Sequence, residues 1–238
     1  MNYGKKKNLA FICALSMSAF ISSCGPKDMD KVGQAQLCID DAAQGEAAAC
    51  LEKIEGIESK GAYALRCSAN FIDEGFTQPA RFREAFEAFD TNASSNTEAF
   101  MSVMTFKSKA TMDDNVTFAS ETLSHCNKSG AKGLMLLGSM ASTSTTLAKV
   151  ANTLTGGGSG TTPTPQQIND ALVDLQNNPD PTTIAAIGSA ISSTYTASCE
   201  NGNANESLCN QLNDALEGID INDPAAVGQA VIDAWAAP

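Results

Sequence analysis

The sequence predicts an all-α protein, in which helical hairpins are stacked as a short irregular α-solenoid or bundle and are joined by disulfides. Apolar residues recur at helical rather than alternating spacing; Phe82, Phe86 and Phe89, for example, are spaced i, i+4, i+7. Two stretches near the C-terminus repeat one another at the length of a helical hairpin. β-branched runs bounded by turn residues, which would indicate a β-sandwich, are missing from the sequence.

The first predicted segment, residues 1–23, is a secretory signal peptide. Three lysines, Lys5 to Lys7, precede Leu9–Ile21, a stretch of thirteen residues without a charge. A basic start followed by a short apolar stretch is typical of export signals. A membrane-spanning helix is the alternative, but it needs about 20 apolar residues. We therefore expect the chain to be exported and this segment to be removed.

The residues at the end of this segment indicate lipid attachment. Ile21-Ser22-Ser23-Cys24 resembles the lipobox of bacterial lipoproteins. The resemblance implies cleavage before Cys24, a diacylglyceryl thioether on its sulfur, and a new N-terminus acylated with a palmitate-type chain. Two or three acyl chains anchor a protein firmly, because each buried methylene contributes about 0.8 kcal/mol. Gly25 follows the cysteine where Asp would imply retention in the inner membrane, so the resemblance implies the outer membrane, on its periplasmic face or at the cell surface.

The expected mature chain is strongly acidic. Removal of the signal takes the 15 basic residues to 12, against 27 acidic residues, which gives a net charge of −15. Such a surface repels nucleic acid and anionic lipid headgroups, so nucleic acid is not an expected partner. Residues 24–30 form the lipidated N-terminus and a tether that spans roughly 12–15 Å. We therefore expect the folded part of the chain to be held close to the bilayer.

Residues 31–155 are predicted to form a helical domain. Helical stripes run through Cys50–Ile57 and through Ala64–Phe71. The stretch from Cys50 to Pro79 resembles a degenerate tetratricopeptide repeat, with a small residue at Cys67, Phe71 one turn later and Pro79 after the second helix. It lacks the aromatic and Leu-Gly signature of that family's first helix. The resemblance implies binding of a protein or peptide in a concave groove.

Residues 156–166 are predicted to be a Gly/Thr/Pro linker, and residues 167–238 a C-terminal helical-repeat region. Glycine and proline in the linker disfavour a helix. After it, Gln167–Leu172 returns as Gln211–Leu216 at an offset of 44, and Asp180-Pro181 returns as Asp223-Pro224 at an offset of 43. Asp followed by Pro is typical of a helix start, since Asp caps the backbone N–H groups and Pro has none to satisfy. Each repeat is therefore expected to be helix, turn and capped helix.

Six cysteines remain after Cys13 leaves with the signal and Cys24 takes the lipid, and an even number in an exported chain indicates disulfides. Residues equidistant from a hairpin turn meet across it. Cys38 and Cys50 each lie six residues from Gln44, and Cys199 and Cys209 each lie five from Ala204. The predicted bridges are Cys38–Cys50, Cys199–Cys209 and Cys67–Cys126. The rival pairing joins Cys50 to Cys67 and Cys38 to Cys126. No Cys-x-x-Cys occurs, so a zinc site is not expected.

No motif in the sequence indicates catalysis, and no cofactor is expected. His125 is the only histidine, and on a helix it would point away from its neighbour Cys126, so the two do not form a catalytic pair. Adjacent carboxylates are interpreted as solvated faces: Asp40-Asp41, Asp73-Glu74 and Asp113-Asp114. Gly133–Gly138, which leads into a stretch of Ala, Ser and Thr up to Leu154, and Ile184–Ser192 are apolar but fall short of a membrane span. We interpret them as buried packing helices; a membrane-inserting or pore-lining role is the alternative.

These observations predict a lipid-anchored cell-envelope protein that is not an enzyme and acts as a binding or scaffold module for an envelope protein partner. Helical repeats, an acidic surface and the lack of a catalytic motif all favour this hypothesis. An envelope enzyme that acts on cell wall or polysaccharide through two carboxylates is one alternative. A purely structural lipoprotein is the other.

Overall fold

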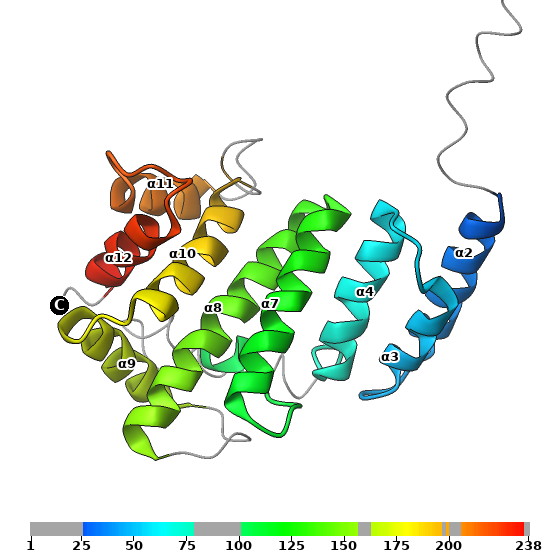
Figure 1. The fold of residues 1–238 in the computed structure, drawn as a ribbon, viewed down its shortest axis with the longest axis horizontal. Coiled ribbons are helices and arrows are strands. Elements are labelled where there is room, and N and C mark those ends of the chain that lie inside the picture. Colours follow the sequence, from blue (N-terminus) through cyan, green and yellow to red (C-terminus); the bar gives the residue numbers. More distant parts are fainter. Residues whose placement is uncertain (1–25, 79–100, 157–162, 197–198, 200–205, 236–238) are drawn as a thin grey trace, which may run out of the picture.

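The helices of the protein stand side by side in one row (Figure 1). The computed structural model describes residues 26–78, 101–156, 163–196, 199 and 206–235. Its elements, in chain order, are α2 (Pro26–Asp40), α3 (Ala47–Cys50), the 3-10 helix η1 (Leu51–Ile54), α4 (Lys60–Asp73), α7 (Met112–Ser129), α8 (Lys132–Thr155), α9 (Pro165–Asn177), α10 (Pro181–Tyr195), α11 (Glu206–Ala215) and α12 (Pro224–Trp235).

Each helix in the row packs mainly against its neighbours. From α2 and α3 at one end, the row continues with α4 on α7, α7 on α8, α8 on α10, and α10 on α12, while α9 lies against α8 and α12 (Figure 1). The predicted all-α fold of stacked helical hairpins with disulfides is therefore confirmed. The phenylalanines Phe82, Phe86 and Phe89 lie outside the described residues.

The hydrophobic core is distributed along the row in three clusters. The first, around Ile39 and Ile54, joins α2, α3, η1 and α4. The second, around Phe71 and Phe106, joins α4 to α7 and the first half of α8. The third, around Leu147 and Ile187, joins the second half of α8 to α9–α12. Burial of apolar area stabilises a protein by roughly 25 cal/mol per Å². Here that stabilisation is distributed over the contacts between neighbouring helices and is not concentrated in one central core.

The first helix begins earlier than the sequence patterns indicate. α2 starts at Pro26 and not near residue 31, because Pro26 can occupy a first helical turn without leaving an N–H unsatisfied and Asp28 complements the helix dipole there. Only Gly25 separates this helix from Cys24. Cys24 itself, the signal segment and Gly25 lie outside the described residues.

The two C-terminal repeat units have the predicted form of helix, turn and capped helix. Asp180 accepts a hydrogen bond from the Thr183 backbone N–H at 3.1 Å at the start of α10. Asp223 accepts from the Ala225 and Ala226 N–H groups at 3.1 and 3.2 Å at the start of α12. Hydrogen bonds from Thr183 hold the pKa of the Asp180 carboxyl below its ordinary value. Both Asp-Pro pairs therefore begin helices, as the repeat predicts.

α10 and α12 cross with their backbones in contact at two glycines. A Cβ atom on Gly188 would overlap the Pro224 carbonyl oxygen and would lie 2.7 Å from the Gly228 nitrogen. A Cβ atom on Gly228 would overlap the Ile184 carbonyl oxygen in the same way. Backbone atoms cannot rotate aside as a side chain does, so the crossing requires a residue without Cβ on both helices.

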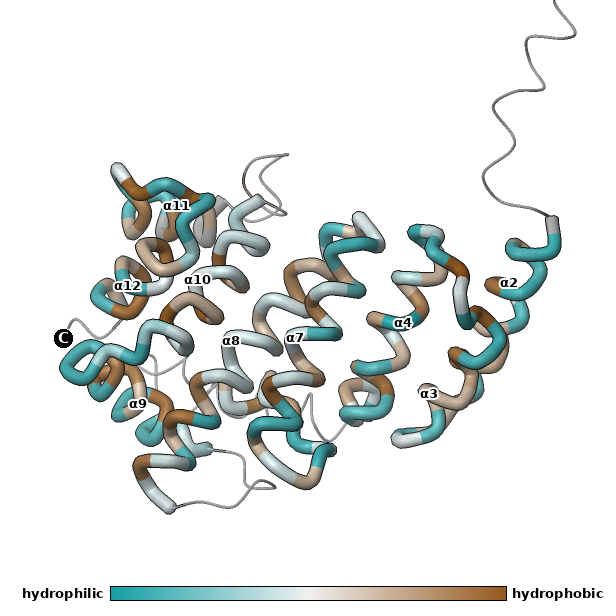
Figure 2. Tube along the Cα trace, in the orientation of Figure 1, coloured by the Kyte–Doolittle hydropathy of each residue, from teal (hydrophilic) through white to brown (hydrophobic). Residues whose placement is uncertain are grey.

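The segment predicted to link two domains joins helices that share a core. Pro163 and Thr164, at its end, lead into α9, whose Ile168 lies in the same cluster as Leu147 of α8. The central part of α8, from Gly138 to Asn152, is largely buried, as expected for a packing helix. Figure 2 shows that each helix in view mixes hydrophilic and hydrophobic residues. Among the residues that the structure describes, none of the helices has both the length and the hydrophobicity to cross a bilayer.

Candidate binding surface between α4 and α7

Three disulfides hold the row together, and they are the three predicted from the sequence. Cα atoms are 5.6 Å apart in Cys38–Cys50, 5.1 Å in Cys67–Cys126 and 5.4 Å in Cys199–Cys209. The rival pairing of Cys50 with Cys67 is therefore wrong. Cys67 lies on α4 and Cys126 on α7, so this bridge fixes the register of the two helices and with it the surface above their contact.

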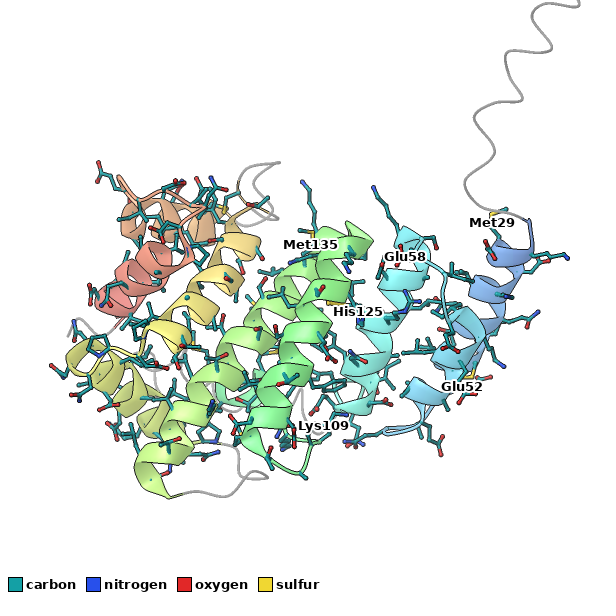
Figure 3. All side chains as sticks on the ribbon, viewed as in Figure 1. Met29, Glu52, Glu58, Lys109, His125 and Met135 are labelled. Atoms are coloured by element: carbon teal, nitrogen blue, oxygen red, sulfur yellow. A yellow bond between two sulfur atoms is a disulfide. The ribbon has the colours of Figure 1, made fainter. Side chains whose placement is uncertain are left out.

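Four side chains meet on that surface: Tyr63 and Arg66 from α4, and His125 and Lys128 from α7. We call them the seam cluster. The Arg66 guanidinium and the Lys128 ammonium each lie 5.1 Å from the centre of the Tyr63 ring, and the His125 ring stacks on Tyr63 with centroids 6.1 Å apart. Figure 3 shows His125 on the part of α7 that adjoins α4.

Local spacing explains why these residues share one surface. Tyr63 and Arg66 are three residues apart on α4, as His125 and Lys128 are on α7, and such residues lie on one face of a helix. Because Arg66 precedes Cys67 and His125 precedes Cys126, the disulfide brings both pairs to the same level. Arg66 also donates a hydrogen bond to the Ile54 carbonyl at 2.8 Å, which fixes its position.

The seam cluster is a positively charged site. Burial, Arg66 and Lys128, in that order, lower the pKa of His125, and Glu121 partly opposes them. The His125 Nδ1 atom is buried and has no hydrogen-bond partner among the described residues. Arg66 and Lys128 likewise form no ion pair with any carboxylate that the structure describes. The site can therefore offer two cations and an imidazole to an anionic group.

The adjacent carboxylates singled out in the sequence have local partners in the structure. Asp73 accepts hydrogen bonds from the Ala47 and Ala48 N–H groups at 2.8 and 3.0 Å, which caps α3. Asp113 pairs with Lys149 at 2.6 Å, and Asp114 accepts from Thr111 at the start of α7. In the first of the three pairs, Asp40 accepts from Gln36 at 2.6 Å and Asp41 is exposed. These carboxylates are thus spread over the row at helix ends and do not face one another.

Glu74 is the most buried of these acids, with 1% of its surface exposed, so its interpretation as part of a solvated face is wrong. Its carboxylate accepts hydrogen bonds from the Lys107 N–H at 2.9 Å, from the Ser108 N–H at 3.2 Å and from the Ser108 hydroxyl at 2.5 Å. These bonds attach the segment before α7 to the end of α4. Glu74 is therefore part of the framework that holds the two helices beside each other.

We expect Glu74→Ala to lower the free energy of unfolding by about 2–4 kcal/mol, because it removes a buried carboxylate that binds the backbone N–H groups of Lys107 and Ser108. Urea denaturation of the purified protein measures this loss. Glu52→Ala is the control, since Glu52 is exposed on η1 and should change stability by less than about 0.5 kcal/mol. Equal effects of the two substitutions would contradict the structural role of Glu74.

Within the described ranges, no group of three His, Cys, Asp or Glu side chains is arranged to hold a metal ion. The sequence predicts only that His125 does not form a catalytic pair with Cys126, and the structure places His125 half-buried beside that bridged cysteine. No sequence pattern singles out Tyr63, Arg66 or Lys128. The available signal was their position next to Cys67 and Cys126 on helices predicted to be joined.

The chain was compared with protein-family models, with curated proteins and with solved structures, and none of them matches. The class of protein is therefore defined by the fold and the surface alone. It is a disulfide-bonded row of α-helical hairpins with a cationic and aromatic site on one helix seam.

Proposed function

We propose that this chain is a cell-envelope protein anchored by lipid in the outer membrane. We further propose that it acts as a binding or scaffold module for a protein partner. The observation that carries the proposal is the single row of helical hairpins, which exposes a long lateral surface for its size. The seam cluster lies on that surface with cations that no described carboxylate neutralises.

The start of α2 supports the proposed anchor. With α2 beginning at Pro26, only Gly25 separates the folded row from Cys24. Two residues of extended chain span at most about 7 Å, so lipid on Cys24 would hold the first helix at the membrane surface. A protein held this way presents its side to other proteins at the same membrane, which is the position that a scaffold requires.

A test of partner binding uses the lipidated full-length protein in native envelopes. The envelopes are crosslinked, solubilised in non-ionic detergent, and the protein is recovered with whatever is bound to it. We expect one protein to be recovered in fixed ratio across detergents. If no partner appears in fixed ratio after crosslinking, the binding hypothesis is wrong.

We expect Cys24→Ala to prevent anchoring, because the thioether that carries two of the acyl chains needs the cysteine sulfur. Cells that make this variant should lose the protein from washed membranes, or accumulate it as the uncleaved precursor, while the wild-type chain stays with the membrane at high salt. Mass spectrometry of the N-terminal peptide measures the lipid directly. Cys13→Ala is the matched control and should leave processing unchanged. An unmodified mature N-terminus at another residue would contradict the proposal.

A further inference from the structure

We propose that the seam cluster (Tyr63, Arg66, His125 and Lys128) is the docking point for an acidic segment of the protein partner. The inference rests on the proposed binding function and adds to it the chemistry of the partner and the place where it binds. It is carried by three features of the site, which are its unneutralised charge, its rigid arrangement and its position on the row.

Three cations gather at this site: Lys60 and Arg66 of α4 and Lys128 of α7. Acidic residues outnumber basic ones by 27 to 15, so carboxylates are available nearly everywhere on the surface. Even so, no described carboxylate forms an ion pair with Arg66, Lys128 or Lys60. Lys60 extends the site toward the end of α7. Its ammonium lies 3.7 Å from the point that a Cβ atom on Gly130 would occupy. The cations of this seam therefore remain available to a partner carboxylate.

The arrangement is fixed before any ligand arrives. Both cations lie over the Tyr63 ring, which attracts them through its negative face and keeps two like charges close together. The Cys67–Cys126 bridge holds the two helices that carry them. Binding to a preorganised site costs little side-chain entropy, so more of the electrostatic attraction remains as affinity.

His125 adds a polar atom in need of a partner. Its Nδ1 is buried and has no hydrogen-bond partner among the described residues, and a buried polar atom in that state is costly. When the imidazole is protonated, both of its nitrogens are donors. A carboxylate lodged between Arg66 and Lys128 would favour the protonated ring and could accept from it.

The position of the site favours a peptide over a lipid surface. Arg66 lies six residues after Lys60, so it is about 9 Å along α4 from the helix end that shares an edge with the start of α2 (Figure 1). Glu58 stands at that same end of α4 (Figure 3), where its carboxylate would repel anionic headgroups. A flexible acidic segment can reach Arg66 along the side of the row, whereas a flat bilayer would contact the helix ends, where Lys60 and Lys128 also lie.

The test measures direct binding of a defined acidic peptide. The lipidated full-length protein in non-ionic detergent is titrated into fluorescein-labelled hexaglutamate, with hexaglutamine as the neutral control, and fluorescence anisotropy reports binding. The variant Arg66→Gln/Lys128→Gln should bind hexaglutamate about tenfold more weakly than the wild-type protein, as expected for the loss of two charge contacts. Lys27→Gln/Lys31→Gln removes the same charge from α2 and should stay within about twofold of wild type.

A second variant guards against a folding defect. Arg66→Lys/Lys128→Arg keeps both charges and should retain binding within about threefold, because the site offers charge rather than one fixed hydrogen-bond pattern. Equal binding by the two glutamine variants would overturn the proposal. Displacement of hexaglutamate by phosphatidylglycerol added to the micelles at equal charge would also overturn it, in favour of a lipid headgroup.

The pH dependence gives an independent measurement. Around His125 stand Tyr63 and Arg66 of α4, and Glu121 and Lys128 of α7. Binding of hexaglutamate should strengthen as the pH falls toward about 5.5, mainly in the lower part of the range, because burial and the two cations hold the pKa of His125 below its ordinary value while glutamate stays ionised. His125→Gln should remove most of this strengthening. An unchanged pH profile in that variant would exclude His125 from the site.

The same variants separate this inference from the proposed function. If the crosslinked envelope partner is still recovered in fixed ratio by Arg66→Gln/Lys128→Gln, the docking point is wrong and the binding function stands. If wild type recovers no partner, the proposed function fails, while hexaglutamate binding still tests the seam cluster by itself.

Discussion

Replacing Gly188 by valine should destabilise the C-terminal half of the row by about 3 kcal/mol or more, because it inserts a branched side chain between two backbones in contact. The first carbon of that side chain would overlap the Pro224 carbonyl oxygen, and it would lie 2.7 Å from the Gly228 nitrogen. α10 and α12 would have to separate to admit it. Their separation would expose the third hydrophobic cluster, which includes Ile187 and Val227.

Thermal unfolding followed by circular dichroism measures this effect. For a chain of this length, the expected loss lowers the midpoint by roughly 6–12 °C. Gly228→Val should act in the same direction, since its Cβ would overlap the Ile184 carbonyl oxygen. Gly33→Ala is the matched control: Gly33 lies within α2, and nothing stands within 4 Å of its Cβ position. It should leave stability unchanged or raise it by up to about 1 kcal/mol. A wild-type midpoint for Gly188→Val would show that α10 and α12 do not pack as described.

Removing the Cys67–Cys126 bridge by Cys67→Ala/Cys126→Ala should cost more than removing either of the other two. The bridge closes a loop across a sequence separation of 59, against 12 for Cys38–Cys50 and 10 for Cys199–Cys209. In the chain-entropy account, this corresponds to about 4 kcal/mol for the long loop and about 3 kcal/mol for each short one. Both sulfurs of the long bridge are also buried in the second cluster, so their loss leaves a cavity as well.

Urea unfolding of the three double-alanine variants tests this order under one set of conditions. The variants Cys38→Ala/Cys50→Ala and Cys199→Ala/Cys209→Ala serve as controls for the loss of a bridge as such. The expectation is contradicted if removing the long bridge lowers the free energy of unfolding by less than removing each of the short bridges does. That result would mean that α4 and α7 are held by their other contacts, among them the buried hydrogen bond from Asn70 to Thr122 at 2.8 Å.

Much of the fold follows from local sequence signals. The spacing of apolar residues predicts helices, and Asp180 and Asp223 predict two of the helix starts. The position of cysteines about hairpin turns predicts two bridges and leaves Cys67–Cys126 as the third. These signals are local because a hairpin turn relates its two helices by symmetry. The symmetry of a turn does not predict which other helices pack against the hairpin.

What could not be predicted depends on contacts between distant segments. The sequence indicates a boundary after residue 155, yet Leu147 of α8 lies in one cluster with Ile168 and Ile187. A Gly/Pro-rich segment shows only that the chain turns there, and it does not show whether the flanking helices pack together. Small residues in 184–192 indicate close packing, but only the structure shows that Gly188 meets the backbone of α12.

The seam cluster was missed for a related reason. Tyr63 and Arg66 are ordinary surface residues of one helix, and His125 and Lys128 are ordinary residues of another, far away in the sequence. They form one cationic and aromatic site only because the two helices are side by side. The predicted Cys67–Cys126 bridge contains that information, since each cysteine directly follows a member of the cluster.

The Cys38–Cys50 bridge determines how the row would respond to a mechanical load at the start of α2. If Cys24 carries the proposed lipid, a pull on it would act on Pro26 and unwind α2 toward its C-terminus. Unwinding would stop at Cys38, where the covalent bond passes the force to Cys50 at the end of α3. α3 is itself held to α4 by the two hydrogen bonds to Asp73. The length that can extend under tension is therefore limited to residues 26–38, and the seam between α4 and α7 would keep its geometry while the membrane moves.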